Sequence, residues 1–190
     1  MKTSDYGIKM IKEFEGFVSH AYKPVPYEEY WTIGYGHYGA DVNEDDVISV
    51  DEAEKLLRND LIIYETEVTA WNFHYKWDQN EFDAMVSFAM NCGIQNFRNL
   101  IKNGDRTKGQ IAEAMLLYVH DSADNVLEGL QTRRQRERSL FLCPVNDATN
   151  KDYQTVDEIV DAIWNGEFGN DEERKEKLYE FFQKKVNERC

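Results

Sequence analysis

The stretch FEGFVSHAYKPVPYEEYWTIGYGH, residues 14–37, joins a glutamate near the end of a predicted helix to a glycine-rich aromatic ribbon. At 100° per residue, a helix over residues 4–18 has an apolar face that consists of Ile8, Ile11 and Val18. Glu15 falls within this face, whereas Glu13 falls on the opposite side. A carboxyl group among apolar side chains is hard to ionise, as a general acid at neutral pH requires. The pattern therefore predicts that Glu15 is functional and that Glu13 lies on the surface.

The residues after Glu15 predict a short hairpin sheet. Gly16 allows the helix to end there, because glycine tolerates the backbone conformation of a helix C-terminus. The aromatic and β-branched residues that follow are typical of strands, and glycines separate them. They are Tyr22, Tyr30, Trp31, Thr32, Ile33 and Tyr35, with Gly34, Gly36 and Gly39. Each feature is common alone, since Glu-Gly ends many helices and aromatic ribbons are usually half-buried sheet.

The order EG, AY and WTIGYGH resembles the phage-type lysozymes of glycoside hydrolase family 24, endolysins that cut the glycan of peptidoglycan. The resemblance covers about residues 6–143. It implies an α+β, mainly helical, lysozyme-like fold with a small N-terminal β-hairpin sheet and a helical lobe. It also implies that Glu15 is catalytic and that Thr32 helps to position the attacking water.

The second catalytic group departs from the family pattern. Hydrolysis of a glycosidic bond needs an acid and a second group that supplies water or a nucleophile. The family places an aspartate nine residues after the glutamate, but Pro24 stands there in this chain, and the loop is two residues longer. If the strand of Thr32 runs regularly back to Glu28, both side chains point to the same side of the sheet. Glu28 is then the candidate second carboxylate, and Lys23 or Asp41 is a candidate for a further contribution at this site.

Two capping boxes predict long helices. Ser49 with Glu52 opens a helix over residues 51–68, and Asp78 with Glu81 opens another that ends at Gly93. The predicted inward residues of the first are Ala53, Leu56, Leu57, Asp60 and Ile63 or Tyr64, and those of the second are Phe82, Met85, Val86, Ala89 and Met90. Further helices are expected over residues 109–120 and 129–142.

An aspartate on an apolar face needs a cation, and His37 is the best candidate to pair with Asp60. The resemblance implies the same structural pair, and we expect no metal site because no third ligand stands nearby. By resemblance, Met90 and Asn91 line the sugar cleft, whereas the sequence alone equally allows Asn91 a helix-capping role. We therefore expect Met90 and Asn91 to bind the substrate. Arg133, in the closing motif of the family, is expected to bind it as well.

The segment GLQTRRQRERSLF, residues 129–141, would usually form a solvated helix face, because it carries four arginines. It also resembles the closing motif of the family, which implies that Arg133 sits against the catalytic glutamate. A guanidinium there holds the acid in position and favours its ionised form. Burial and ion pairing thus oppose each other at Glu15.

Composition limits the remaining functions. The 190 residues suffice for one domain and a small module, and the net charge of −14 argues against nucleic acid and anionic membranes as partners. Three scattered cysteines form neither a disulfide framework nor a zinc motif. Because no apolar run suits a signal peptide or a membrane span, we expect synthesis in the host bacterial cytoplasm and release to the wall by another factor. We expect a monomer without cofactor.

Composition changes after residue 143, which predicts a linker over residues 144–153 and a small helical module over residues 154–190. The module's expected apolar stripe is Val156, Ile159, Val160 and Ile163. It resembles a CPL-7-type wall-binding repeat, well in the first half of the repeat and less well afterwards, and Arg174 is the candidate wall-binding residue. The alternative is a structural C-terminal extension.

We therefore expect a muramidase that cleaves the β-1,4 bond between N-acetylmuramic acid and N-acetylglucosamine in bacterial peptidoglycan. One alternative is a lytic transglycosylase, which needs a single acid/base and closes the sugar's own hydroxyl onto the anomeric carbon. The other is a non-catalytic wall-binding protein on a lysozyme scaffold, with Pro24 as the sign of lost catalysis.

Overall fold

The computed structural model describes residues 1–25, 27–120, 123–143, 155–164, 166–169, 174–179 and 181–182. Its described elements, in chain order, are α1 (Asp5–Glu15), β1 (Val18–Tyr22), β2 (Trp31–Gly34), β3 (His37–Gly39), α2 (Val50–Ala70), α3 (Asn72–Tyr75), α4 (Gln79–Cys92), α5 (Ile94–Leu100), the 3-10 helix η1 (Lys102–Gly104), α6 (Lys108–Met115), α7 (Glu128–Leu142) and α8 (Val156–Trp164). The predicted class, α+β and mainly helical with a small N-terminal sheet, is confirmed.

Helix α1 ends as its glycine predicts, but earlier than the apolar pattern indicated. Gly16 follows Glu15 with φ of 71°, and its N–H donates to the carbonyl of Lys12. Val18 therefore lies in β1 rather than on the helix, and it is 39% exposed. The expectation that Val18 shares the buried helix face is wrong, because a left-handed glycine breaks the 3.6-residue period before it.

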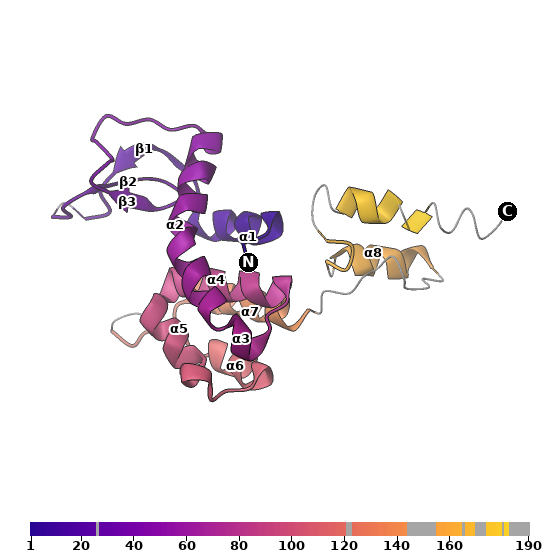
Figure 1. Cartoon of the computed structure of the whole chain (residues 1–190). Coiled ribbons are helices and arrows are strands. Elements are labelled where there is room, and N and C mark those ends of the chain that lie inside the picture. The colour runs from indigo at the N-terminus through magenta and orange to yellow at the C-terminus, as the bar shows by residue number, and fades with distance from the viewer. Residues whose placement is uncertain are drawn as a thin grey trace.

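The three strands form an antiparallel sheet in the order β1-β2-β3 (Figure 1). In β2 and β3, Thr32 is opposite Tyr38 and Ile33 is opposite His37. The register between β1 and β2 shifts, with Val18 opposite Gly34 and Tyr22 opposite Thr32. Because Gly34 and Gly36 both have positive φ, the turn between β2 and β3 is tight, and it brings Gly36 back toward the end of α1.

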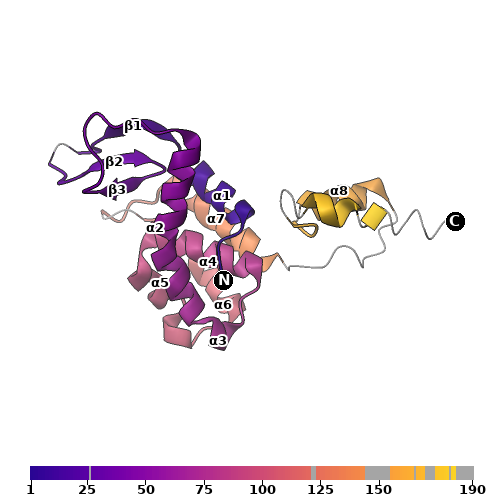
Figure 2. The ribbon, with the colours of Figure 1, turned by 45° about the horizontal axis from the view of Figure 1, so that its top comes forward.

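Helix α2 connects the sheet to the helical lobe. Its N-terminal part packs on β2 and β3, and its later turns pack on α4, as Figures 1 and 2 show. The predicted capping box of Ser49 and Glu52 is present. Ala53 and Leu57 are buried as expected, but Ile63 is 57% exposed, and Leu61 and Glu65 take inward positions instead. Of the two predicted alternatives, Tyr64 packs against the core and Ile63 lies outside it.

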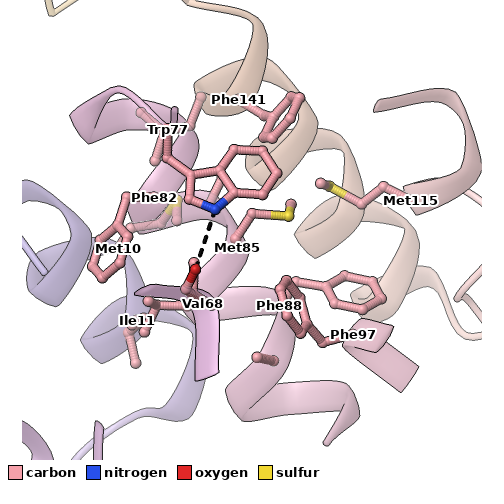
Figure 3. Close-up of a cluster of buried hydrophobic side chains, with 14 of the residues drawn as sticks. Met10, Ile11, Val68, Trp77, Phe82, Met85, Phe88, Phe97, Met115 and Phe141 are labelled. Carbon is pink, nitrogen blue, oxygen red and sulfur yellow. Dashed lines mark hydrogen bonds between the residues drawn. The ribbon is translucent and has the colours of Figure 1, made fainter. Parts of the chain in front are cut away.

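The core of the helical lobe surrounds α4, in which every residue from Asn80 to Ala89 is buried. The second predicted capping box, of Asp78 and Glu81, is also present. Trp77 is part of this core, and its indole N–H donates to the carbonyl of Val68 at 3.2 Å (Figure 3). Helix α7 packs along α4. The helix that carries Met90 and Asn91 and the helix that carries Arg133 therefore share one core.

Three short elements escaped prediction, and one predicted helix is shorter than expected. Elements α3, α5 and η1 are too brief to show an apolar period. The helix expected over residues 109–120 ends at Met115, and the Val119 carbonyl instead accepts a hydrogen bond from the Leu127 N–H. The α-helical pattern stops where the N–H groups of Leu117 and Tyr118 donate to carbonyls three residues back instead of four, and an isolated bridge between His120 and Val126 follows.

The C-terminal segment has a hydrophobic core of its own. Ala162, Phe168 and Phe181 are buried in it, and the two phenyl rings meet edge to face with centroids 5.6 Å apart. Ile159 and Ile163 pack on this core as predicted, but Val156 is 74% exposed, and Val160 is also exposed. The predicted stripe is thus only half buried. The proposed linker, residues 144–153, lies outside the described residues.

Candidate active site

Glu15 is the last residue of α1, and an arginine from α7 holds it. Arg133 Nη1 donates to Glu15 Oε1 at 2.7 Å, and the Glu15 side chain is 25% exposed, whereas Arg133 is buried. The Arg133 guanidinium also stacks on the ring of Phe14, 4.8 Å from its centroid. The contact between Glu15 and Arg133 that the resemblance implies is therefore present. Glu13 is exposed on the other side of α1 and pairs with Arg136 at 2.6 Å.

The Arg133 side chain belongs to a buried charge cluster, which we define as Arg133, Arg134, Glu137 and Glu15. Arg133 Nε donates to Glu137 Oε1 at 3.1 Å, and Arg134 Nη2 donates to the same oxygen at 3.3 Å. Ser87 Oγ on α4 donates to it at 2.6 Å. Two guanidiniums thus face two carboxylates, and the formal charge of the cluster is zero. This balance allows α7 to bury charges that would otherwise be too costly.

Helix α1 is also anchored at its start and in its last turn. Asp83 on α4 accepts hydrogen bonds from the backbone N–H of Ser4 at 3.0 Å and from the Ser4 hydroxyl, and Ser4 in turn caps the helix by accepting from the Gly7 N–H. Lys12 pairs with Glu54 of α2 at 2.6 Å. The position of Glu15 is therefore set by contacts to both α2 and α4.

Glu15 opens into a cavity of about 760 Å³ between the sheet and the helical lobe. We refer to it as the cleft. Its lining residues are Glu15, Gly36, Tyr38, Asn59, Asp60, Ile62, Ile63, Tyr64, Met90 and Asn91. A Cβ atom on Gly36 would lie 3.9 Å from Glu15 Oε2, so the turn between β2 and β3 leaves space beside this oxygen. The cleft is thus lined by two carboxylates, those of Glu15 and Asp60, and by both polar and apolar side chains.

The structure brings together three of the predicted site residues in the cleft: Glu15, Met90 and Asn91. Asn91 Oδ1 accepts a hydrogen bond from Arg134 Nη2 at 2.7 Å, which ties the cleft wall to the charge cluster. The Gly93 N–H donates to the Ala89 carbonyl and ends α4 with positive φ, so the backbone closes the helix without help from Asn91. Arg133 lies behind Glu15 and is absent from the cleft lining.

Thr32 and Glu28 lie elsewhere. Thr32 is buried on β2 and is not among the residues that line the cleft. The premise that strand geometry continues back to Glu28 is wrong, because β2 begins at Trp31 and Glu28 belongs to the preceding loop. There Lys23 Nζ donates to the Glu28 carbonyl at 2.7 Å. Glu28 is also absent from the cleft lining.

His37 and Asp60 form the predicted pair. Nδ1 of His37 lies 2.9 Å from both carboxylate oxygens of Asp60, and Asp41 approaches Nε2 at 3.3 Å. Burial opposes protonation of His37, but the hydrogen bonds with Asp60 and Asp41 outweigh it and raise the pKa of His37 above its ordinary value. The pair ties the sheet to α2, and Asp41 acts here as a second partner of His37. Within the described residues, no group of three acidic, histidine or cysteine side chains has the geometry to hold a metal ion.

The sequence hypothesis missed Arg134, Glu137 and Ser87. Their signal in the sequence was the position of Glu137, four residues after Arg133 and three after Arg134, together with Ser87 inside an otherwise apolar stretch of helix. In the C-terminal segment, Arg174 Nε donates to the Gly169 carbonyl at 3.1 Å, a contact within the segment itself. No helix among the described residues has the length and apolarity that crossing a membrane requires.

Comparisons with known proteins agree with this geometry. The family model for phage lysozyme matches residues 12–137. An endolysin of Bacillus phage B103 is 44% identical over 146 residues, which are 75% of this chain and 54% of that protein. The chain thus spans about half the length of this relative, and likewise of the endolysin of Bacillus phage PZA.

Solved structures are similar in fold. The muramidase domain of SpmX from Asticaccaulis excentricus has a TM-score of 0.69 at 34% identity, covering 75% of this chain and 99% of that one. An endolysin from an Escherichia coli phage, FAHEc1, has a TM-score of 0.62 at 33% identity, with 75% and 94% covered. These similarities confirm the lysozyme-like arrangement of sheet and helical lobe.

Proposed function

Because the chain belongs to the phage lysozyme family, we propose that it is a peptidoglycan hydrolase of the glycoside hydrolase family 24 type. Its substrate is the bacterial wall, and the bond cleaved is the β-1,4 linkage between N-acetylmuramic acid and N-acetylglucosamine. The observation that carries the proposal is the Glu15 carboxylate, which is held by Arg133 and opens into the cleft. The names endolysin and muramidase domain among its relatives support the same substrate.

In this proposal Glu15 is the general acid. Arg133 engages Oε1, so Oε2, which lies toward Gly36 and the cleft, is the oxygen free to deliver a proton to the leaving glycosidic oxygen. Arg133 orients the carboxyl group through its hydrogen bond to Oε1. Exposed Ile62 and Ile63 and half-buried Met90 provide apolar surface for the faces of sugar rings.

For the second group we propose Thr32 as the residue that helps to order the attacking water, on the strength of its match to the family motif. Glu28 is the alternative second carboxylate. Neither Thr32 nor Glu28 is among the residues that line the cleft, and Glu28, on the loop before β2, lacks the motif match that favours Thr32. Asp60, the other carboxylate of the cleft, is already engaged by His37 through both of its oxygens.

Glu15→Gln should lower cleavage of purified peptidoglycan by at least about 10²-fold, because the amide keeps the shape but donates no catalytic proton. Turbidity loss measures the rate, and circular dichroism checks the fold. Glu13→Gln is the matched control, since Glu13 lies on the same helix and also pairs with an arginine, yet is exposed. Full activity of Glu15→Gln would remove this residue from the mechanism. Glu28→Gln in the same assay retires Glu28 if its activity is unchanged.

The products separate hydrolysis from transglycosylation. Mass spectrometry of the unreduced digest should find reducing muramic ends, because hydrolysis adds water across the bond. A lytic transglycosylase would leave 1,6-anhydro ends, lighter by one water. Anhydro ends would overturn the hydrolase assignment.

We further propose that residues 1–143 form the catalytic domain and residues 154–190 a small wall-binding module of the CPL-7 type, with Arg174 as a candidate contact. The separate core of Ala162, Phe168 and Phe181 supports an independent module.

A further inference from the structure

We propose that the hydroxyl group of Tyr64 binds the substrate, donating a hydrogen bond to a hydroxyl or acetamido oxygen of the sugar that lies beside Glu15. The inference rests on the proposed function, since it names a further contact to the same glycan. It adds to the cleft a donor on α2, opposite the wall that Met90 and Asn91 of α4 provide.

Tyr64 lies one helical turn after Asp60 on α2, so the two side chains point in similar directions. Both line the cleft together with Glu15. Tyr64 therefore shares the cleft with Glu15, which would meet the scissile bond there.

The Tyr64 hydroxyl is a donor that the protein leaves unused. The carboxylates of the cleft and one of its amide oxygens are engaged by protein donors: Glu15 Oε1 by Arg133, Asp60 by His37, and Asn91 Oδ1 by Arg134. Among the described residues, the Tyr64 hydroxyl makes no hydrogen bond, although its ring packs against the hydrophobic core. A ring held by the core presents its hydroxyl in a fixed direction, so ordering it costs the complex little conformational entropy.

Tyr64 acts as a donor rather than as a nucleophile or base. Burial, and then the negative charges of Asp60 and Glu15, raise the pKa of Tyr64 above its ordinary value. The phenol accordingly keeps its proton at neutral pH. A neutral donor beside two anions suits the uncharged oxygens of a sugar, because it forms a hydrogen bond without adding a third negative charge.

Tyr64→Phe tests this role, because it removes only the hydroxyl. Binding of soluble, peptide-free N-acetylglucosamine–N-acetylmuramic acid oligomers is measured by calorimetry in the Glu15→Gln background, which prevents turnover. We expect binding that is about two- to tenfold weaker, as for the loss of one neutral hydrogen bond. The melting temperature should stay the same, since the hydroxyl has no protein partner among the described residues.

Tyr6→Phe is the matched control. Tyr6 is also half-buried and packed on the core, but it lies on α1 and lines a different cavity. Equal affinity of Tyr64→Phe and its parent would overturn the inference, and so would a loss that Tyr6→Phe shares. Neither result touches the proposed function, which fails instead if the unmodified protein does not cleave peptidoglycan.

Discussion

Glu137→Gln tests whether charge balance holds α7 in place. Glu137 is fully buried, and its Oε1 accepts hydrogen bonds from Ser87 Oγ, Arg133 Nε and Arg134 Nη2. Glutamine keeps nearly the same shape but removes the negative charge. The two guanidiniums are then left with Glu15 as their only carboxylate in the cluster, and the cluster carries a net charge of +1.

The structure suggests a large effect. Removing one partner of a buried ion pair costs about 3–5 kcal/mol, because the other charge stays buried without compensation. That is a large share of the roughly 5–15 kcal/mol by which a domain is stable. At about 2–4 °C per kcal/mol for a protein of this size, the melting temperature should fall by roughly 6–20 °C.

Thermal unfolding followed by circular dichroism measures this fall, and Glu13→Gln is the control. Glu13 and Arg136 also join α1 to α7, at 2.6 Å, but the Glu13 side chain is 45% exposed. An exposed pair contributes about 0–1 kcal/mol, so the control should melt within a few degrees of the parent. Equal melting temperatures for both variants would refute the charge-balance argument. Burial raises the pKa of Glu137, and such a result would mean that Glu137 is already uncharged in the folded protein.

Two further predictions concern pH and the C-terminal segment. Burial raises the pKa of Asp83 from 3.8 to about 6, so between these values the folded protein keeps a proton that the unfolded chain releases, and the stability due to Asp83 falls as pH rises. The free energy of unfolding of Asp83→Asn, relative to the parent, should therefore increase by about 3 kcal/mol between about pH 3 and pH 7 in urea titrations; a difference that does not vary with pH would contradict this. A chain that ends after residue 143 should still cleave soluble fragments but sediment less with intact wall, and equal sedimentation would favour a structural extension.

Local signals predicted most of the fold. The capping boxes at Ser49 and Asp78 mark the starts of α2 and α4, and Gly16 and Gly93 mark the ends of α1 and α4. Each of these depends on hydrogen bonds within a few residues, so the sequence carries the information directly. The strands followed from aromatic and glycine spacing, which is also a local signal.

The burial of α7 could not be predicted from its own residues. Arg133, Arg134, Arg136 and Arg138 are chemically alike, and the helix shows no strong apolar period that would indicate its inward face. Which two arginines are buried depends on where α4 and α1 lie, above all on Ser87 and Glu15, which are distant in sequence. The family motif supplied Arg133 alone.

The prediction for the loop before β2 failed for a different reason. Period-2 reasoning holds only where a ladder of hydrogen bonds keeps the backbone extended. That ladder begins at Trp31, three residues after Glu28, so the direction of the Glu28 side chain was never fixed by strand geometry. Sequence reasoning about a catalytic group is therefore weakest where the chain departs from its family by insertion.

The place of Glu15 illustrates how these levels combine. The carboxylate lies at the end of helix α1. The start of this helix is hydrogen-bonded to Asp83, Lys12 in its last turn forms an ion pair with Glu54, and Glu15 itself accepts a hydrogen bond from Arg133. These contacts reach α4, α2 and α7, so Glu15 cannot shift without disturbing the helical lobe. Such over-determination suits a general acid, because a proton donor must stay within hydrogen-bond reach of one oxygen of a bound glycan. A substrate-binding donor, by contrast, must be free of protein partners. The Tyr64 hydroxyl has none among the described residues, so its hydrogen bond can be made to the sugar.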